Sequence, residues 1–325
     1  MTNYGIDFSL FSNRLSGSVE YYRKRSTDII WQLPINSTYG FSNLLFNTAN
    51  MQGHGVDVGL TVGIIASKKI NWYTTVNASY NTNIIKDARF ERPTTSFDPE
   101  YLYSGYPSDY VFSYAWAGLD NLGQSLIRDP KNPAKTYTVN EFPTQEIRVY
   151  SGRSTSPWIG MWSNTVRYKG LELNVQFQGA FGGVFRKPSI ESIGFSNNIF
   201  VGRTGDMEER WRKPGDEAFR NVPGLEFGVG TNYFASIDRY RFSDYLIRSR
   251  SNIRLQQVSL SYEVPAHLLA RIYTKGLTVS AVARNLGMIW AANKEKLDPE
   301  YLYTTGNNYQ LPPITNYSFR IVLTL

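Results

Sequence analysis

The stretch Tyr317-Ser-Phe-Arg-Ile-Val-Leu-Thr-Leu325 closes the chain and alternates strictly between two kinds of side chain. Successive side chains of a β-strand point to opposite faces, so one face carries Tyr317, Phe319, Ile321, Leu323 and Leu325. The opposite face carries Ser318, Arg320, Val322 and Thr324. A wholly apolar face backed by one with a central Arg suits a transmembrane β-barrel, where one face meets lipid and the other a wet lumen. The stretch therefore predicts that strands upstream follow the same rule.

The same period-two alternation recurs along the chain. It is found near residues 6–10, 15–21, 56–64, 70–80, 158–168, 171–178, 253–264, 277–283 and 317–325. A change of phase between Leu255 and Val258 predicts a β-bulge, and Lys169-Gly170 predicts a two-residue turn. At roughly ten residues for each crossing, the pattern gives about nine membrane-crossing strands.

Short turns alternate with long connections along the chain. Ser12-Asn13-Arg14, Ala66–Lys69 and Lys169-Gly170 are short, whereas the polar segment 33–50 and the segment 183–243 are long. Outer-membrane barrels have short periplasmic turns and long extracellular loops. A further hairpin between Tyr110 and Arg128 has a second arm, 124–127, that is too short to cross, so we expect it in an extracellular loop.

Composition is compatible with this fold class. The 325 residues are 42% hydrophobic with a mean hydropathy of −0.35, and no run approaches the ~18 apolar residues of a membrane helix. A barrel gives such an average because only alternate residues face lipid. The absence of cysteine excludes disulfides, thiol catalysis and thiolate metal sites. The net charge of +7 is spread over turns and loops, which argues against nucleic-acid binding.

Catalytic signals are weak. His54 and His267 lie far apart without metal-ligand spacing, and Gly179-Ala-Phe-Gly-Gly183 lacks the Lys-Ser/Thr of a phosphate loop. We therefore expect no enzyme activity, no metal and no cofactor. Strand alternation begins already at Ile6 without a basic and apolar leader, so we expect an N-terminal part to be missing.

Several motifs together resemble SusC/RagA-type TonB-dependent outer-membrane transporters. They are Arg14-Leu-Ser-Gly-Ser-Val-Glu-Tyr-Tyr-Arg-Lys-Arg-Ser-Thr-Asp28, Gly105-Tyr-Pro with Ala117–Gly123, Tyr168–Leu173 with Phe181-Gly-Gly, and Arg254–Pro265 followed by Arg284-Asn-Leu and Asp298-Pro-Glu. Their order and spacing cover nearly the whole chain.

The resemblance implies an all-β, antiparallel transmembrane β-barrel of the roughly 22-stranded, plugged class. Residues 1–325 would be its C-terminal partial barrel, with the plug domain and signal peptide absent. Such proteins import oligosaccharides or peptides across the cell outer membrane, with a SusD-like lipoprotein as lid and TonB acting through the plug. Two alternatives remain: a structural or adhesive outer-membrane barrel without transport, and a soluble glycan-binding β-protein.

Aromatic residues of the loops are the candidate substrate-binding groups. The hexapeptide Asp-Pro-Glu-Tyr-Leu-Tyr occurs at 98–103 and 298–303 and offers Tyr101, Tyr103, Tyr301 and Tyr303 as platforms for glycan or peptide. The alternative is that Asp-Pro starts turns and Tyr packs loops together. Trp116, Trp211 and Trp290 are similar loop candidates, whereas Trp72 and Trp162, read as near turns, favour a membrane-interface belt.

Arg23 and Arg25 continue the outward phase of Leu15, Val19 and Tyr21. About ten residues from the short turn bring a strand to the far interface, where lipopolysaccharide phosphates lie. We therefore expect the two arginines to contact lipopolysaccharide; the alternative is solvated arginines paired with loop acids.

Overall fold

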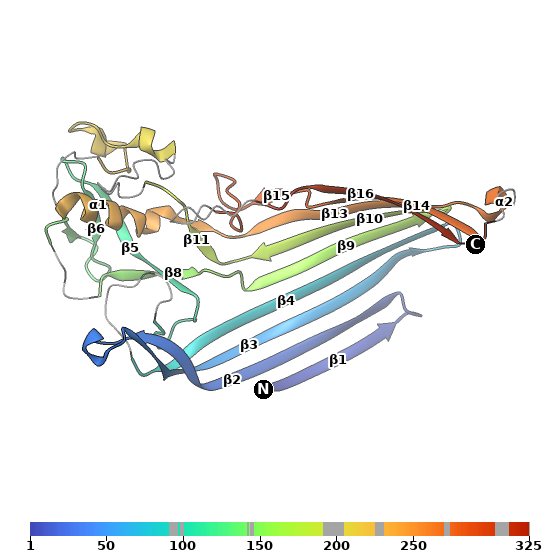
Figure 1. Ribbon diagram of the computed structural model, residues 1–325, viewed down its shortest axis with the longest axis horizontal. Helices are drawn as coiled ribbons and strands as arrows, with labels where there is room; N and C mark the ends of the chain where they lie inside the picture. The colour runs from blue at the N-terminus through green and yellow to red at the C-terminus, as the bar shows by residue number, and fades with distance from the viewer. Residues whose placement is uncertain are drawn as a thin grey trace.

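The computed structural model describes residues 1–90, 97, 101–141, 143, 146–190, 205–224, 231–269, 274–302 and 312–324. One large antiparallel sheet dominates it (Figure 1). Nine strands follow one another across this sheet: β1 (Thr2–Leu10), β2 (Leu15–Pro34), β3 (Asn43–Ala66), β4 (Ile70–Ala88), β9 (Trp158–Tyr168), β10 (Leu171–Phe181), β13 (Asn252–Glu263), β14 (Gly276–Arg284) and β16 (Asn316–Thr324). A short strand, β15 (Met288–Ala291), pairs with β13 beside them. The predicted strand count and antiparallel order are confirmed.

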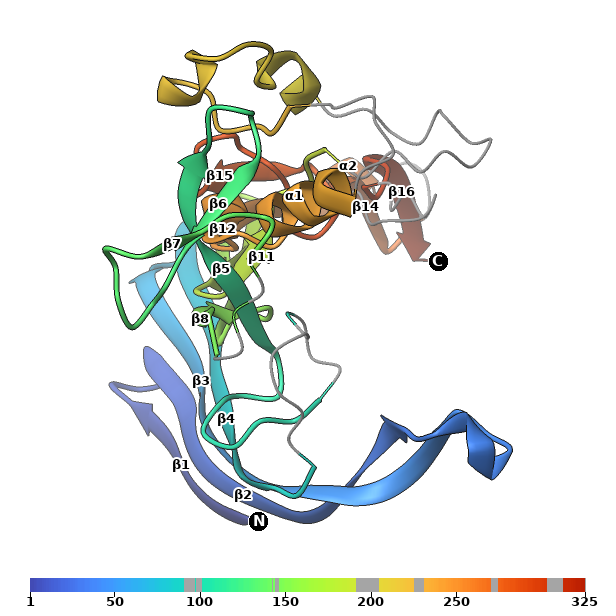
Figure 2. The ribbon, with the colours of Figure 1, turned by 90° about the vertical axis from the view of Figure 1, so that its left-hand side faces the viewer.

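The sheet is an open arc. Seen along its long axis, it curves from β1 and β2 round to β14 and β16 (Figure 2). β1 pairs only with β2, and β16 pairs only with β14, among the strands described. The arc therefore has the shape of part of a barrel wall with two free edges.

Short turns gather at one end of the sheet and long connections at the other. Lys169 and Gly170 both have positive φ, 47° and 81°, as the predicted two-residue turn requires. The strands β1 and β2, and likewise β3 and β4, are also joined by short turns. The predicted sorting of connections by length therefore holds for these three turns (Figure 1). It does not hold for β13 and β14, whose connection at the same end, 264–275, is longer than the connection 35–42 between β2 and β3 at the other end.

The predicted bulge is also present. The register between β10 and β13 shifts where Gln176 opposes Gln257 and Phe177 opposes Leu255, which leaves Gln256 as the extra residue. One loop prediction was wrong: most of segment 33–50 is strand, because β2 and β3 remain paired as far as Pro34 and Asn43. The true loop holds only the short helix η1 (Ser37–Tyr39).

The long connections fold into a layer of their own, which we call the loop layer. A separate sheet in the order β7-β6-β5-β8 contains β5 (Tyr110–Leu119), β6 (Ser125–Arg128), β7 (Thr136–Tyr137) and β8 (Arg148–Arg153). The predicted 110–128 hairpin therefore lies outside the main sheet. Two short strands, β11 (Val184–Arg186) and β12 (Ile247–Ser249), pair beside it.

Helices are few in the described part of the chain. α1 (Thr231–Arg241) belongs to the loop layer with the short helices η2 (Gly205–Glu209), η3 (Asp216–Ala218) and η4 (Asp244–Leu246), and α2 (Ala266–Leu269) lies at the short-turn end (Figure 1). None of the helices described is long and apolar enough to span a membrane.

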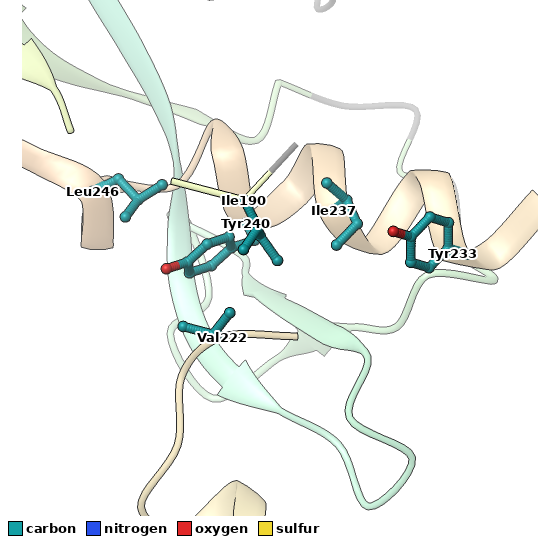
Figure 3. Packing of buried hydrophobic residues seen from close by; sticks show 6 residues of the cluster. All are labelled: Ile190, Val222, Tyr233, Ile237, Tyr240 and Leu246. Carbon is teal, nitrogen blue, oxygen red and sulfur yellow. The ribbon is translucent and has the colours of Figure 1, made fainter. Parts of the chain in front are cut away.

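The buried hydrophobic core lies in the loop layer. One cluster joins Ile237 and Tyr240 of α1, which are 0% and 1% exposed, to Ile190, Val222, Tyr233 and Leu246 (Figure 3). In contrast, the large apolar side chains of the main sheet stay exposed, such as Ile6 at 70% and Phe319 at 83%. Such an apolar sheet surface needs a non-aqueous neighbour.

Most of the exposed apolar side chains belong to one face of the sheet, which we call the outer face; Ile159, Met161 and Val322 are exposed on the other. A cross-strand row on this face is aromatic in five of six strands: Tyr4, Tyr21, Val56, Tyr80, Trp158 and Phe181 are successive register partners. Tyr80 and Trp158 are in ring contact at 4.7 Å. We call this set the aromatic row. Such rows of aromatic residues mark the interfaces of membrane barrels.

Two further tryptophans lie on the outer face. Trp72 is close to the short turn before Ile70, as expected. The position expected for Trp162 was wrong, because it lies in mid-strand opposite Val76, where its ring stacks on Phe177 at 5.3 Å. Its indole N–H donates to the hydroxyl of Thr74 at 2.7 Å, which satisfies two polar groups on an otherwise apolar surface.

Candidate functional site

The opposite, inner face of the sheet is polar and hollowed. A cavity of about 470 Å³ lies against β2, β3, β4, β9 and β10. Its lining includes Ser18, Glu20, Asp57, Asn77, Ser79 and Gln178, with Ile159 and Met161 as apolar members. We call this surface the inner hollow. Gly59 contributes to its depth, since a Cβ there would meet Ser18 Oγ at 3.3 Å.

Two carboxylates face each other directly in the inner hollow. Glu20 and Asp57 are register partners, an arrangement that costs stability through like-charge repulsion. Neutral donors offset it: the Ser79 hydroxyl donates to Asp57, and the Asn3 amide donates to Glu20 at 3.1 Å. None of the described residues that line the cavity is Lys or Arg. The surface is therefore rich in acceptors and suits ligands that present hydroxyl or amine donors.

In the first copy of the repeated hexapeptide the structure describes residues 101–103, and these pack inside the loop layer. Tyr103 is 8% exposed and its ring meets those of Tyr110 and Phe112 edge-on at 5.4 and 5.9 Å. The Arg148 guanidinium covers the Tyr103 ring at 5.2 Å, and Tyr101 accepts a hydrogen bond from the Tyr110 hydroxyl through its carbonyl. The structure thus gives both tyrosines packing contacts, and their predicted role as ligand platforms stays a prediction.

Arg254 contacts three residues of the second copy of the hexapeptide. This guanidinium pairs with Asp298, lies 3.4 Å from Glu300 and sits 5.4 Å above the ring of Tyr301. The Asp298 carboxylate also accepts the backbone N–H of Glu300 at 3.0 Å, which makes the expected Asp-Pro turn. Tyr303, the fourth predicted platform, lies outside the described residues. The two copies of the hexapeptide therefore have different partners.

Two of the predicted tryptophans, Trp116 and Trp211, belong to the loop layer and contact the adjacent residues Asn221 and Val222. In the loop layer the Trp116 indole N–H donates to Asn221 at 3.1 Å, and the ring meets Tyr240 edge-on at 5.5 Å. The Trp211 indole N–H donates to Glu217 at 3.0 Å and holds the pKa of that carboxyl below its usual range.

Trp290 differs from the other two. It lies on β15 opposite Ile253 and near Phe181, with ring centroids 6.3 Å apart, so the expected loop position was wrong. It is 45% exposed on the outer face. Its predicted role in ligand binding stays a prediction.

The residues of the inner hollow were not singled out as a site by the sequence. Alternation shows which face each residue occupies, but only register brings Glu20, Asp57 and Ser79 side by side. Counting from the short turns does not supply this register, because β2 and β3 are joined through residues 35–42 and the pairing of β3 with β4 shifts by one residue between Gly63 and Ile65. Within the residues described, no group of three or more His, Cys, Asp or Glu is arranged to hold a metal ion.

Comparison with known proteins finds similar sequences among TonB-dependent receptors. No family model matches the chain. It is 25% identical over 349 residues to TonB-dependent receptor P39 of Formosa agariphila and 23% identical over 319 residues to TonB-dependent receptor P26 of the same organism. Each alignment covers 94% of this chain but 33% and 30% of the relatives, so the chain spans about a third of their length.

The fold agrees with the sequence relatives. The structure of the RagAB peptide transporter matches 99% of this chain and 34% of its own, with a TM-score of 0.75 and 24% identity. The RagAB peptide importer in its closed-closed state gives the same TM-score at 22% identity. The predicted fold class, an antiparallel partial β-barrel, is confirmed. Over nearly its whole length the chain is therefore similar to SusC/RagA-type TonB-dependent outer-membrane transporters, in sequence and in fold.

Proposed function

We propose that this chain is the C-terminal part of the barrel of an outer-membrane TonB-dependent transporter that takes up oligosaccharides or peptides. The observation that carries the proposal is the inverted polarity of the sheet. Its outer face exposes apolar side chains up to the aromatic row, whereas its inner face holds the acceptor-rich inner hollow. A wall of this kind separates lipid from a wet lumen.

The inner hollow is the part of the wall on which a ligand would move. Glu20 and Asp57 accept hydrogen bonds from sugar hydroxyls and from the ammonium or amide groups of peptides alike. Met161 and Ile159 beside them give apolar contact. This mixture serves transient binding, and the role needs no covalent chemistry.

Partners follow from the same proposal. A SusD-like lipoprotein would cover the end that carries the loop layer, and TonB would act through a plug domain held elsewhere in the full-length protein. The aromatic candidates of the loop layer, including Trp116, Trp211 and Tyr301, would then lie between lid and lumen. Outer-membrane lipid would surround the outer face.

The test is uptake by cells that depend on the full-length protein. Deletion of its gene should abolish growth on either an oligosaccharide or a peptide mixture as sole nutrient, and complementation should restore it. Glu20→Gln with Asp57→Asn should slow uptake about tenfold, because two charge-assisted hydrogen bonds are lost.

A matched control is Glu263→Gln, which removes one carboxylate at the short-turn end, away from the inner hollow. It should leave uptake unchanged. Normal growth of the deletion strain on both nutrient classes would contradict transport and favour a structural or adhesive barrel.

A further inference from the structure

Beyond the aromatic row, the outer face becomes basic. Arg23 and Arg25 follow Tyr21 by two and four positions on β2, so all three belong to the outer face. Arg23 lies opposite His54 of β3, and all three basic side chains are exposed. We call Arg23, Arg25 and His54 the outer basic patch.

The change in polarity occurs at the same place on three neighbouring strands. The next outer-face residue towards the loop layer is Arg23 after Tyr21 on β2, His54 after Val56 on β3, and Thr82 after Tyr80 on β4. Below this step the outer-face residues are apolar, as Val19, Val58 and Ala78 are. The step therefore marks the edge of the apolar band.

Counting along β2 gives the same position. Leu15 begins the strand at the short turn, and Arg25 is the tenth residue after it. A tilted strand crosses a bilayer in roughly 9–11 residues. The two guanidinium groups thus reach the far interface, and their aliphatic stems can lie along apolar surface while the charged ends meet head groups.

Asp28 of β2 and Asp87 of β4 contact Arg89 and not the outer basic patch. Asp28 pairs with Arg89 at 2.7 Å, and Asp87 lies 3.8 Å from the same guanidinium. Among the residues described, neither Arg23 nor Arg25 lies within ion-pair distance of a carboxylate. The contact with loop acids that the sequence left open is therefore not made there.

We propose that the outer basic patch binds the phosphate groups of lipopolysaccharide, an inference that rests on the proposed outer-membrane location. Alternate residues of a strand lie about 6.5–7 Å apart along it, so the two guanidinium groups can hold one phosphorylated head group together. Each guanidinium can donate two parallel hydrogen bonds to a phosphate. The aromatic row, which lies nearer the bilayer midplane than the patch, would contact the acyl chains near the interface.

The experiment uses the full-length protein folded into three kinds of vesicle: phosphatidylcholine alone, with phosphatidylglycerol, or with lipopolysaccharide. Arg23→Gln with Arg25→Gln should bind lipopolysaccharide about tenfold more weakly and lose its stabilisation by that lipid. Lys24→Gln is the matched control, since Lys24 lies between the two arginines on the inner face. It should behave as the wild type.

Each outcome decides a separate question. An equal loss of stability of the double variant in all three vesicles would overturn lipid binding by the patch. So would an equal loss of stability for Lys24→Gln. Equal losses with phosphatidylglycerol and with lipopolysaccharide would overturn the choice of lipopolysaccharide, and competition by inorganic phosphate alone would assign the site to a free anion. Failure of the wild type to insert into plain phosphatidylcholine would contradict the proposed function instead.

Discussion

At the scale of the residue, Gly55 shows how neighbouring strands of the inner face fit together. Tyr22, its register partner on β2, lays its ring over the glycine, and the Tyr22 hydroxyl accepts a hydrogen bond from the Asn81 amide at 2.9 Å. A Cβ at Gly55 would lie 2.4 Å from this ring and 2.5 Å from the Tyr80 carbonyl oxygen. An aromatic ring that covers a glycine on the next strand is a known way to pin register.

We therefore expect Gly55→Ala to destabilise the folded barrel by about 1–3 kcal/mol, since backbone and ring must both move. Urea unfolding of the full-length protein in vesicles measures the change. Gly59→Ala is the control on the same strand and face, because its Cβ would meet only side-chain atoms at 3.3 Å or more. Equal destabilisation by both substitutions would refute the close packing of Tyr22.

Residues of β16 test the assignment of the two faces. Ile321 lies opposite Val279 on the outer face, and Val322 lies opposite Thr278 on the inner face. Ile321→Arg should cost about 2–4 kcal/mol near the bilayer midplane, whereas Val322→Arg places its charge towards water. Folding of the full-length protein into vesicles should distinguish them, and equal effects would exclude a lipid-facing Ile321.

At the scale of the element, α1 is fixed to the loop layer by polar contacts as well as by the apolar cluster around Tyr240. Ser125 of β6 donates its backbone N–H to Ser236 Oγ and its hydroxyl to the Ser236 carbonyl, both at 2.8 Å. Arg239 is buried and donates to the carbonyls of Tyr137 and Glu141 at 3.0 and 2.7 Å. Burial lowers the pKa of Arg239, which reflects how closely the helix packs.

Arg239→Ala should loosen α1, because it leaves two carbonyl groups without their donor and each costs about 1–3 kcal/mol. Hydrogen exchange should quicken in α1 and β6 while the main sheet keeps its protection. Arg241→Ala on the same helix removes a 3.6 Å contact with Asp238 and a 5.8 Å contact with the Phe242 ring but no hydrogen bond to a carbonyl, so we expect little change. Faster exchange throughout the main sheet would show that the loop layer and the barrel wall unfold together.

Elements differ in how far the sequence could predict them. Alternation identified the strands of the main sheet, because each strand has one apolar and one polar face. It missed the outer part of the β2–β3 hairpin, where Leu44 and Leu45 are adjacent and the period of two is broken. It also missed α1, because the apolar side of this helix faces residues as distant as Ile190 and Val222.

The candidate site shows the same limit. Tyr103 and Trp116 looked like loop platforms, yet their ring partners Phe112 and Tyr240 are known only from tertiary packing. The inner hollow depends on register across five strands, which alternation alone does not supply. The position of Arg23 and Arg25 on the outer face, by contrast, follows directly from the phase of β2.

At the scale of the whole molecule, the open arc has a specific consequence for folding. In the described structure β1 and β16 each offer one unpaired edge, and both strands expose large apolar residues, with Tyr4 at 67% and Ile321 at 70%. Water can form hydrogen bonds with the unpaired backbone N–H and C=O groups of these edges only where no lipid covers them. In hydrocarbon each unsatisfied backbone group costs several kcal/mol, so an open sheet edge is not stable there.

The isolated 325-residue chain should therefore fail to insert into vesicles as a stable monomer. It should aggregate through its edges, or assemble only when the remaining strands of the barrel are supplied as a second polypeptide. Electrophoresis without heating is the measurement, since a closed barrel migrates differently before and after it is boiled. Co-folding with the complementary strands should restore the heat-modifiable band, whereas the chain alone should give none. A monomeric, heat-modifiable barrel formed by this chain by itself would contradict the partial-barrel assignment, because its two edges would then have to pair with each other.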